Sequence, residues 1–359
     1  MKRKRITQLL LIIISIFNAG IVYSQESTMN TEENTTWYDG KTLTIEGKGW
    51  ENTNAYYERL PGKAEGKVTK DVWWLSHHTA GLSLRFTTNS SFVKIRWVLW
   101  KHEGSTNMPP TSVSGIDVYA KKENGEFIYL CTGFPRADTN TVTVQLIPAK
   151  EYIINLSLYN GVKSIEIGIP KDKHIAGTKI DKSRLEKTIV FYGTSITQGG
   201  CASRPGMAFT TIVGRKLDVP IINLGFSGNG KMEMEMEELL AELNPSVYVL
   251  DCIWNMNSKM IEERVAPFVL KLRESKPNIP IVLAEDSHYM DVSPTKKGKV
   301  LRTIYKKLVA DGVEQLYFLS NKGMLGTDGE ATVDGVHPSD LGMVRMSVVF
   351  TDFLRKFVK

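Results

Sequence analysis

The sequence contains few cysteines and histidines for its length, and it has no long uninterrupted apolar run. Its 359 residues include 3 cysteines and 6 histidines. Cys131, Cys201 and Cys252 are odd in number, lie far apart and lack the close spacing of metal ligands. We therefore expect buried free thiols, and neither a disulfide framework nor a zinc site.

The longest apolar stretch lies near the start of the chain. Four basic residues at positions 2–5 precede an apolar run at residues 9–14, which continues weakly to Val22 and reaches the small residue Ser24. This pattern is typical of an export signal and is too short for a comfortable membrane span. We predict a signal peptide over residues 1–24 and a periplasmic or secreted protein with no stable membrane insertion. An uncleaved anchor helix is the alternative.

The net positive charge is small once this leader is set aside. The whole chain has a net charge of +6, and residues 2–5 supply four of these charges, which leaves +2 for the remainder. No basic stripe remains that could neutralise a phosphate backbone. A nucleic-acid partner is therefore not expected.

The remainder of the chain shows two periodicities, which predict two domains. From Trp37 to about Ile169, short segments alternate apolar and polar residues, and Asn-Gly turns separate some of them. This pattern is typical of an antiparallel β-sandwich with jelly-roll topology. We predict this domain over residues 25–180, with a polar linker at about residues 170–186. The predicted strands include residues 82–86, 93–97, 141–146, 153–158 and 164–169.

Residues 181–359 show a different pattern, in which short apolar strands alternate with helices. Continuous apolar strands of this kind indicate a parallel sheet covered on both faces, and active sites of such sheets lie at the carboxyl ends of the strands. The predicted strands are residues 188–192, 221–224, 247–250, 281–284 and 316–319. The predicted helices are residues 207–217, 232–243, 260–273, 297–310 and 340–357.

Polar or glycine-rich motifs follow three of these strands and precede the last helix. The first strand leads into GTSITQGG at residues 193–200, and the second runs into NLGFSGNG at residues 223–230. The third ends in DCIWN at residues 251–255, and DGVHP stands at residues 334–338. Each motif alone is common. Four of them in this order, each at the expected place, indicate one catalytic edge.

At these motifs, over roughly residues 185–359, the sequence resembles the SGNH hydrolases, also called the GDSL family. The four blocks of the family supply Ser, Gly, Asn and His, and the matching positions are Ser195, Gly228, Asn255 and His337. Thr194 and Ile196 depart from the Asp and Leu of the family name. Asn257 is the alternative to Asn255, because the third block lacks the common Gly-x-Asn-Asp form.

The N-terminal half carries a second resemblance. Residues 114–119, SGIDVY, resemble the GxDLY motif of a sandwich domain that precedes some bacterial SGNH esterases. Together the resemblances imply a flavodoxin-like, three-layer α/β hydrolase domain preceded by an all-β jelly-roll domain.

The chemistry of a serine esterase explains these residue types. A serine hydroxyl needs a base, and His337 would take the proton of Ser195 while Asp334, three residues earlier, holds the other imidazole nitrogen. The oxyanion hole would consist of the backbone N–H groups of Ser195 and Gly228 and the side-chain amide of Asn255. This chemistry requires no cofactor and no metal. Cys201 competes as nucleophile, but no histidine adjoins it in sequence and the motif spacing favours the serine.

The predicted reaction is the hydrolysis of short-chain esters. The family resemblance and the export signal together imply acetyl esters of a sugar or polysaccharide as the substrate. A lipid or lysophospholipid esterase is one alternative, which the lack of a long apolar lid disfavours. A carbohydrate-binding protein with an inert hydrolase-like domain is another, which the intact Ser195, Asp334 and His337 set disfavours.

Some aromatic and histidine residues are tempting as ligand-binding groups. Most of the tryptophans at positions 73, 74, 97 and 100 are expected in the sandwich core because of their strand spacing, although they could stack on sugars. His77, His78, His102, His174 and His288 are expected to be structural or solvated.

Overall fold

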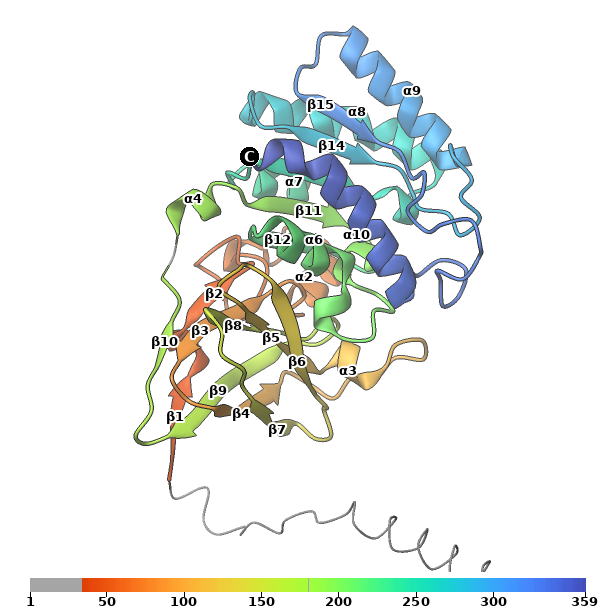
Figure 1. Ribbon diagram of the computed structural model, residues 1–359. Helices are drawn as coiled ribbons and strands as arrows, with labels where there is room; N and C mark the ends of the chain where they lie inside the picture. Colours follow the sequence, from red (N-terminus) through yellow and green to blue (C-terminus); the bar gives the residue numbers. More distant parts are fainter. Residues whose placement is uncertain (1–33, 180) are drawn as a thin grey trace, which may run out of the picture. The chain divides into compact units, whose positions relative to one another are not determined.

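Five apolar strands form a parallel sheet in the C-terminal half of the computed structural model, which describes residues 34–179 and 181–359 (Figure 1). Their order is β12-β11-β13-β14-β15, the 2-1-3-4-5 order of flavodoxin-like sheets. The register pairs Gly193 with both Gly225 and Asp251, which places three strand ends level with one another. The strands are β11 (Ile189–Gly193), β12 (Ile221–Gly225), β13 (Val247–Asp251), β14 (Ile281–Ala284) and β15 (Leu316–Leu319).

Helices cover both faces of this sheet. One face packs on α7 (Met234–Leu240), α8 (Ser258–Ser275) and α9 (Lys296–Ala310), and the other packs on α6 (Phe209–Leu217) and α10 (Asp340–Leu354). The strands bury nearly every side chain, because helices lie against both faces. The predicted three-layer α/β architecture is confirmed.

The N-terminal half contains two antiparallel sheets around a shared apolar core. One sheet has the order β1-β9-β4-β7, and the other has the order β10-β3-β8-β5-β6, with β2 also pairing with β3. Trp97 lies fully buried in this core. The strands are β1 (Thr35–Asp39), β2 (Thr44–Glu46), β3 (Ser83–Thr88), β4 (Phe92–Leu99), β5 (Ile116–Lys121), β6 (Phe127–Gly133), β7 (Thr139–Gln145), β8 (Glu151–Asn155), β9 (Val162–Pro170) and β10 (Ile175–Gly177). The predicted antiparallel β domain is confirmed.

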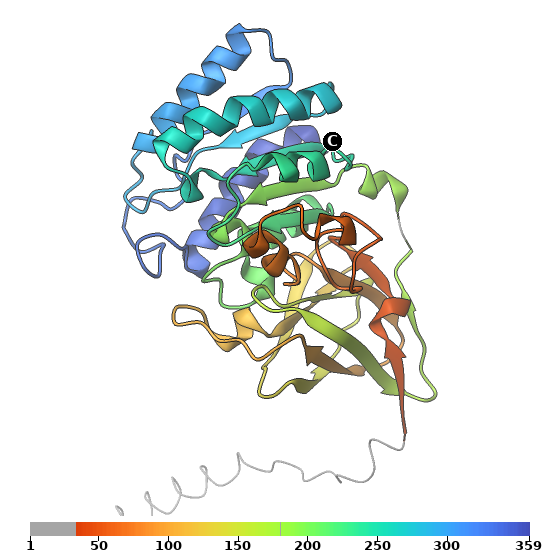
Figure 2. The same cartoon turned by 180° about the vertical axis from the view of Figure 1, so that it is seen from behind.

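Much of the segment between β2 and β3 packs on the C-terminal sheet, although Tyr57 of this segment lies in the sandwich core. It contains the short helix α2 (Lys70–Ser76), and Figure 2 shows it in dark orange beside the C-terminal domain. Leu60, Val72 and Leu75 join the apolar core formed by β11, β12, β13, α7 and α8. Residues 37–359 form one compact unit. The N-terminal half therefore supplies part of the hydrolase core.

Some local expectations differ from the structure. The predicted linker contains strand β10, which pairs with β3, and the short helix α4 (Lys182–Leu185), which Asp181 caps. Cys201 and Cys252 are buried free thiols, but Cys131 is only half-buried because it lies on the edge strand β6. The predicted signal peptide at residues 1–24 lies outside the described residues. Of the helices in the described part of the chain, none is long and apolar enough to cross a membrane.

Candidate active site

Ser195 lies at a tight strand-to-helix turn at the carboxyl end of β11. It opens the short helix α5 (Ser195–Gln198), which Thr194 caps through its side chain and which Gly199 ends in the left-handed region with φ 110°. A side chain at position 193 would clash with Thr197 Oγ1, so the turn needs glycine there. Ser195 keeps 9% of its surface exposed. The sequence GTSITQGG therefore presents one serine at the end of the strand.

The structure brings Ser195, His337 and Asp334 into a hydrogen-bonded chain. Ser195 Oγ lies 2.9 Å from His337 Nε2, and His337 Nδ1 lies 2.8 Å from Asp334 Oδ2. Partial burial alone would raise the pKa of Asp334, but hydrogen bonds from His337 and from the backbone of Val336 outweigh it and lower this pKa to about 2. The carboxylate is therefore charged at neutral pH and can hold the imidazole and stabilise an imidazolium.

Hydrogen bonds within the loop hold the segment that carries His337 and Asp334. Asp334 Oδ1 accepts from the backbone N–H groups of Val336 and His337 at 3.1 and 2.8 Å, and Gly335 adopts φ 83°. The turn is therefore of the Asx type, which Asp favours by sequence. The loop leads directly into α10, whose first residue, Asp340, accepts from Ser203 N and Oγ.

A loop of the N-terminal half completes this side of the site. Asn107 Nδ2 donates to Asp334 Oδ2 at 3.1 Å, and Cys201 Sγ donates to the carbonyl oxygen of Asn107 at 3.3 Å. Met108 packs beside Cys201. Loop 101–110 therefore reaches the Ser195 site, although nothing in the sequence identifies Asn107 as the residue that makes the contact.

The predicted oxyanion residues lie in two neighbouring loops. Gly228 adopts φ 69° in the turn after β12. Asn255 Nδ2 lies 3.4 Å from the carbonyl oxygen of Phe226 and 3.3 Å from that of Gly230, so its amide borders the Gly228 turn. Asn257 instead caps α8 by accepting from Met260 N at 2.9 Å. The geometry therefore favours Asn255 over Asn257, while the oxyanion roles stay predictions.

Cys201 adjoins the hydrogen-bonded chain of Ser195, His337 and Asp334 but is poorly suited to act as a nucleophile in place of the serine. Burial, together with the nearby charge of Asp334, raises the pKa of its thiol to about 11, so the thiol keeps its proton at neutral pH. Ligand atoms of Cys201, Asp334 and His337 lie within 4.8 Å of one another, the one such group found in residues 34–179 and 181–359. A metal there would displace the hydrogen bonds of His337 and would need the thiol to ionise.

Buried residues of the N-terminal half hold the strand beneath the Gly228 turn. Arg59, 2% exposed, donates to four backbone carbonyl oxygens. These belong to Leu75, His78, Asn223 and Gly225. Burial lowers the pKa of Arg59 to about 9, which leaves the guanidinium charged at neutral pH. Sequence reasoning missed this residue, because its partners on β12 lie more than 160 positions away.

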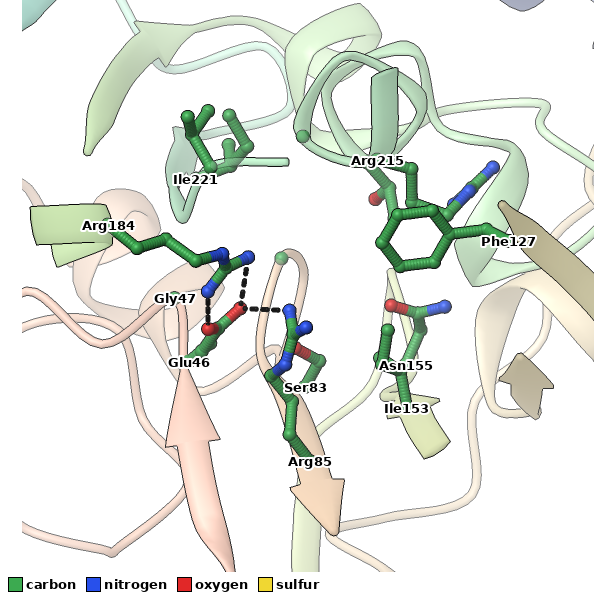
Figure 3. A pocket seen from close by; sticks show the side chains of 14 residues that line it. Glu46, Gly47, Ser83, Arg85, Phe127, Ile153, Asn155, Arg184, Arg215 and Ile221 are labelled. Carbon is green, nitrogen blue, oxygen red and sulfur yellow. Dashed lines mark hydrogen bonds and ion pairs between the residues drawn. The ribbon is translucent and has the colours of Figure 1, made fainter. Parts of the chain in front are cut away.

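A cavity between the two halves of the chain has none of Ser195, His337 and Asp334 in its lining (Figure 3). Glu46 accepts from both Arg85 and Arg184, and the three side chains meet at its edge. Arg85 also pairs with Glu151. Because these charges neutralise one another, we assign the cluster to the junction of β2, β3, β8 and α4 and not to catalysis.

A known family model matches each half of the chain. Residues 186–355 match the model of the GDSL-like lipase/acylhydrolase family, and residues 35–175 match the GxDLY model, described as the N-terminus of SGNH-hydrolase-type esterases. A search of curated proteins finds no match.

Solved structures show the same two-part fold. A protein from Bacteroides ovatus described as a GDSL-like lipase shares 32% identity, with TM-score 0.83 over 90% of this chain and 98% of that one. The salicylyl acyltransferase SsfX3 of a tetracycline biosynthetic pathway shares 17% identity, with TM-score 0.70 over 88% and 95%. A family two carbohydrate esterase from Cellvibrio japonicus shares 12% identity, with TM-score 0.59 over 90% and 98%; the last two likenesses show the fold alone.

The match to the family model and the likeness to the Bacteroides ovatus structure together identify the family. The chain belongs to the GDSL-like lipase/acylhydrolase family, within the SGNH esterases, and carries a GxDLY-type N-terminal domain.

Proposed function

We propose that this protein hydrolyses acetyl esters on the hydroxyl groups of a sugar or polysaccharide. The observation that carries the proposal is a pocket of limited size with a mixed polar and aromatic lining, which includes Tyr159, the residue whose hydroxyl donates to the carbonyl oxygen of Ser195. Its volume is about 340 Å³, and Trp74, Glu103, Ser105 and Asn229 contribute to its walls. An acetyl group on a sugar matches this lining better than a fatty acyl chain, which needs a long apolar channel.

The reaction follows from the hydrogen bonds at Ser195. The serine oxygen attacks the acetyl carbonyl carbon while His337 Nε2 takes its proton, and Asp334 stabilises the imidazolium. The oxyanion is stabilised by the N–H groups of Ser195 and Gly228 and the Asn255 amide. The tetrahedral intermediate collapses, and the leaving sugar oxygen takes the proton from His337. Water, activated by the same imidazole, then releases acetate and restores the serine.

The proposed location of the protein fits this substrate. We propose that residues 1–24 direct export and are removed, which would place the enzyme where polysaccharides are accessible. The basic start and the apolar run of these residues support this step. N-terminal sequencing of protein recovered outside the cytoplasm of the expressing cell would test it, with Gln25 as the expected first residue.

Acetate release from a panel of substrates tests the proposed function. We expect acetate from at least one of acetylated xylan, acetylated mannan and acetylated pectin, and no fatty acid from lysophosphatidylcholine. Fatty acid release without acetate release would instead support the lipid esterase. A lack of turnover on every ester, 4-nitrophenyl acetate included, would support the binding-protein alternative.

Ser195→Ala is the matched variant for this panel. It should lower kcat by about 10⁴–10⁶-fold, because the three residues of a triad act as a unit, and it should leave the melting temperature close to that of the native protein. Retained activity in this variant would reject Ser195 as nucleophile, and labelling of Ser227 by a serine-directed phosphonate would identify the residue to test next.

A further inference from the structure

The pocket beside Ser195 is built largely from the N-terminal half of the chain. Leu75 and His78 line one part of it, and Ser227 and Asn229, which flank Gly228, line another. Tyr159 also lines the pocket and donates from its hydroxyl to the carbonyl oxygen of Ser195 at 3.2 Å. Tyr159 therefore connects the pocket to Ser195, and Ser227 and Asn229 connect it to the predicted oxyanion turn.

His78 is the most deeply buried ionisable residue in this lining, with 1% of its surface exposed. Its neighbour Gln198 has a fixed amide orientation. Gln198 Oε1 accepts from Ser227 N at 3.0 Å, and Gln198 Nε2 donates to the carbonyl oxygen of Leu158 at 3.0 Å. Gln198 Nε2 also lies 3.1 Å from His78 Nδ1. Since an amide nitrogen only donates, Nδ1 accepts, and the single proton of the neutral ring lies on Nε2.

The protonation state agrees with this geometry. Burial foremost, and then the positive charges of Arg59 and Lys101, lower the pKa of His78 to about 2, so the ring is neutral at any pH at which the enzyme would work. Throughout residues 34–179 and 181–359, no atom accepts a hydrogen bond from Nε2. A buried donor left unpaired in this way costs about 1–3 kcal/mol of stability, and a ligand oxygen that accepted from it would offset this cost.

We propose that His78 Nε2–H donates a hydrogen bond to an oxygen of the sugar that carries the acetyl group, and that His78 is thereby a specificity residue of this esterase. The inference rests on the proposed function. Trp74, 40% exposed, supplies an apolar wall within 4.7 Å, centroid to centroid, of the His78 ring. A sugar has hydroxyl oxygens that accept hydrogen bonds and a ring face of C–H groups that packs on aromatic side chains. A neutral ring N–H beside an indole suits both.

His78 has two roles that different substitutions separate. Its Nδ1 supports Gln198, and through Gln198 the backbone of Ser227 next to Gly228; its Nε2 is the proposed donor to the sugar. In His78→Asn the amide oxygen can still accept from Gln198, but no donor reaches the position of Nε2. In His78→Gln the longer amide can present N–H near that position, but the acceptor for Gln198 is lost. The two variants are therefore complementary.

The test compares kcat/KM on two substrates that differ in the leaving group. The substrates are 4-nitrophenyl acetate and the best substrate among monoacetylated methyl glycosides of xylose, glucose and mannose. His78→Asn should lower kcat/KM for the glycoside by about 10- to 100-fold more than for 4-nitrophenyl acetate, because only the glycoside loses a hydrogen bond. His78→Gln should lower both values but recover most of the ratio between them.

Each outcome decides between the two roles. Equal losses on both substrates in both variants would mean that His78 acts only through Gln198 and would overturn the proposal, as would an unchanged ratio in folded His78→Asn. His174→Asn, an exposed histidine outside the pocket, is the matched control and should change neither value. If the native enzyme cleaves 4-nitrophenyl acetate but none of the glycosides, the proposed function fails and this inference fails with it. Circular dichroism and thermal melting confirm that each variant is folded.

Discussion

The two sides of Ser195 are held by different kinds of structure. On the side of the base, His337 and Asp334 are three residues apart in a partly exposed loop whose hydrogen bonds are mainly local, with one added by Asn107 of the N-terminal half. On the side of the Gly228 turn, the supporting residues Arg59 and Gln198 are buried, and their hydrogen bonds join segments far apart in the chain. The predicted proton-transfer pair is positioned mainly by local contacts, whereas the predicted oxyanion turn depends on contacts between distant segments.

The sharpest way to test this comparison is to remove the N-terminal half. A fragment of residues 181–359 would lose Leu60, Val72 and Leu75 from the hydrolase core and the guanidinium of Arg59 from β12. We expect no cooperative thermal unfolding and no esterase activity from this fragment, because an apolar face of its core becomes exposed. A fragment that melts cooperatively and cleaves 4-nitrophenyl acetate would show that the turn needs no support from outside the domain.

Substitution of Arg59 tests the same support at one position. Arg59→Met should lower the free energy of unfolding by roughly 3–5 kcal/mol, since four buried carbonyl oxygens lose their donor together. Arg96→Met is the control. Its half-exposed ion pair with Glu166 should contribute less than about 1 kcal/mol. Urea titrations followed by circular dichroism measure both, and equal losses would contradict the role given to Arg59.

The asparagine pair tests the oxyanion side directly. Asn255→Ala should lower kcat by roughly 10²–10³-fold with little change in KM, if its amide stabilises the developing charge. Asn257→Ala should keep kcat and lose only a helix cap, which costs about 1 kcal/mol of stability. Steady-state kinetics on 4-nitrophenyl acetate distinguish them. The reverse pattern would assign the oxyanion role to Asn257.

Two aspartates, one on each side, should respond to pH in opposite ways. Burial foremost raises the pKa of Asp251, under the Ser195 turn, to about 7, with Asp286 adding to this effect and the Thr197 hydroxyl opposing it. A folded-state pKa above the unfolded value gives stability that is fully present below about pH 4 and is lost as pH rises through about 7. Asp334, with its lowered pKa, instead gives stability that is lost as pH falls toward about 2.

Asp251→Asn separates these effects. The difference between its melting temperature and that of the native protein should rise between pH 5 and pH 8, by the equivalent of roughly 2–3 kcal/mol. Only the native protein carries the Asp251 carboxyl group, whose raised pKa makes the native protein less stable over this range, whereas the asparagine amide does not ionise. Asp334→Asn should show no such rise in this range. Parallel melting curves for Asp251→Asn and the native protein would mean that Asp251 ionises normally.

The sequence was sufficient to predict the parallel sheet, because each strand is buried on both faces and reads as a short apolar run. It was also sufficient to predict that Ser195, Asp334 and His337 lie together, since each stands in a local motif at a strand or helix end. The segment before β3 could not be predicted, because its helix has only seven residues and its apolar side chains follow no period. Most of the four tryptophans were expected in the sandwich core, but only Trp97 lies in it; Trp74 is 40% exposed, since it lies on this segment and not on a strand.

The contact between Arg59 and β12 has a consequence for solubility. β12 is an edge strand of the parallel sheet, and an uncovered edge can template pairing with another chain. Asn223 and Gly225, whose carbonyl oxygens Arg59 occupies, alternate along the strand with Leu224. The backbone of Gly81 approaches Asn223 so closely that a side chain there would clash with it. The N-terminal half thus covers this edge of the sheet against pairing with another chain, and it also lines most of the pocket beside Tyr159.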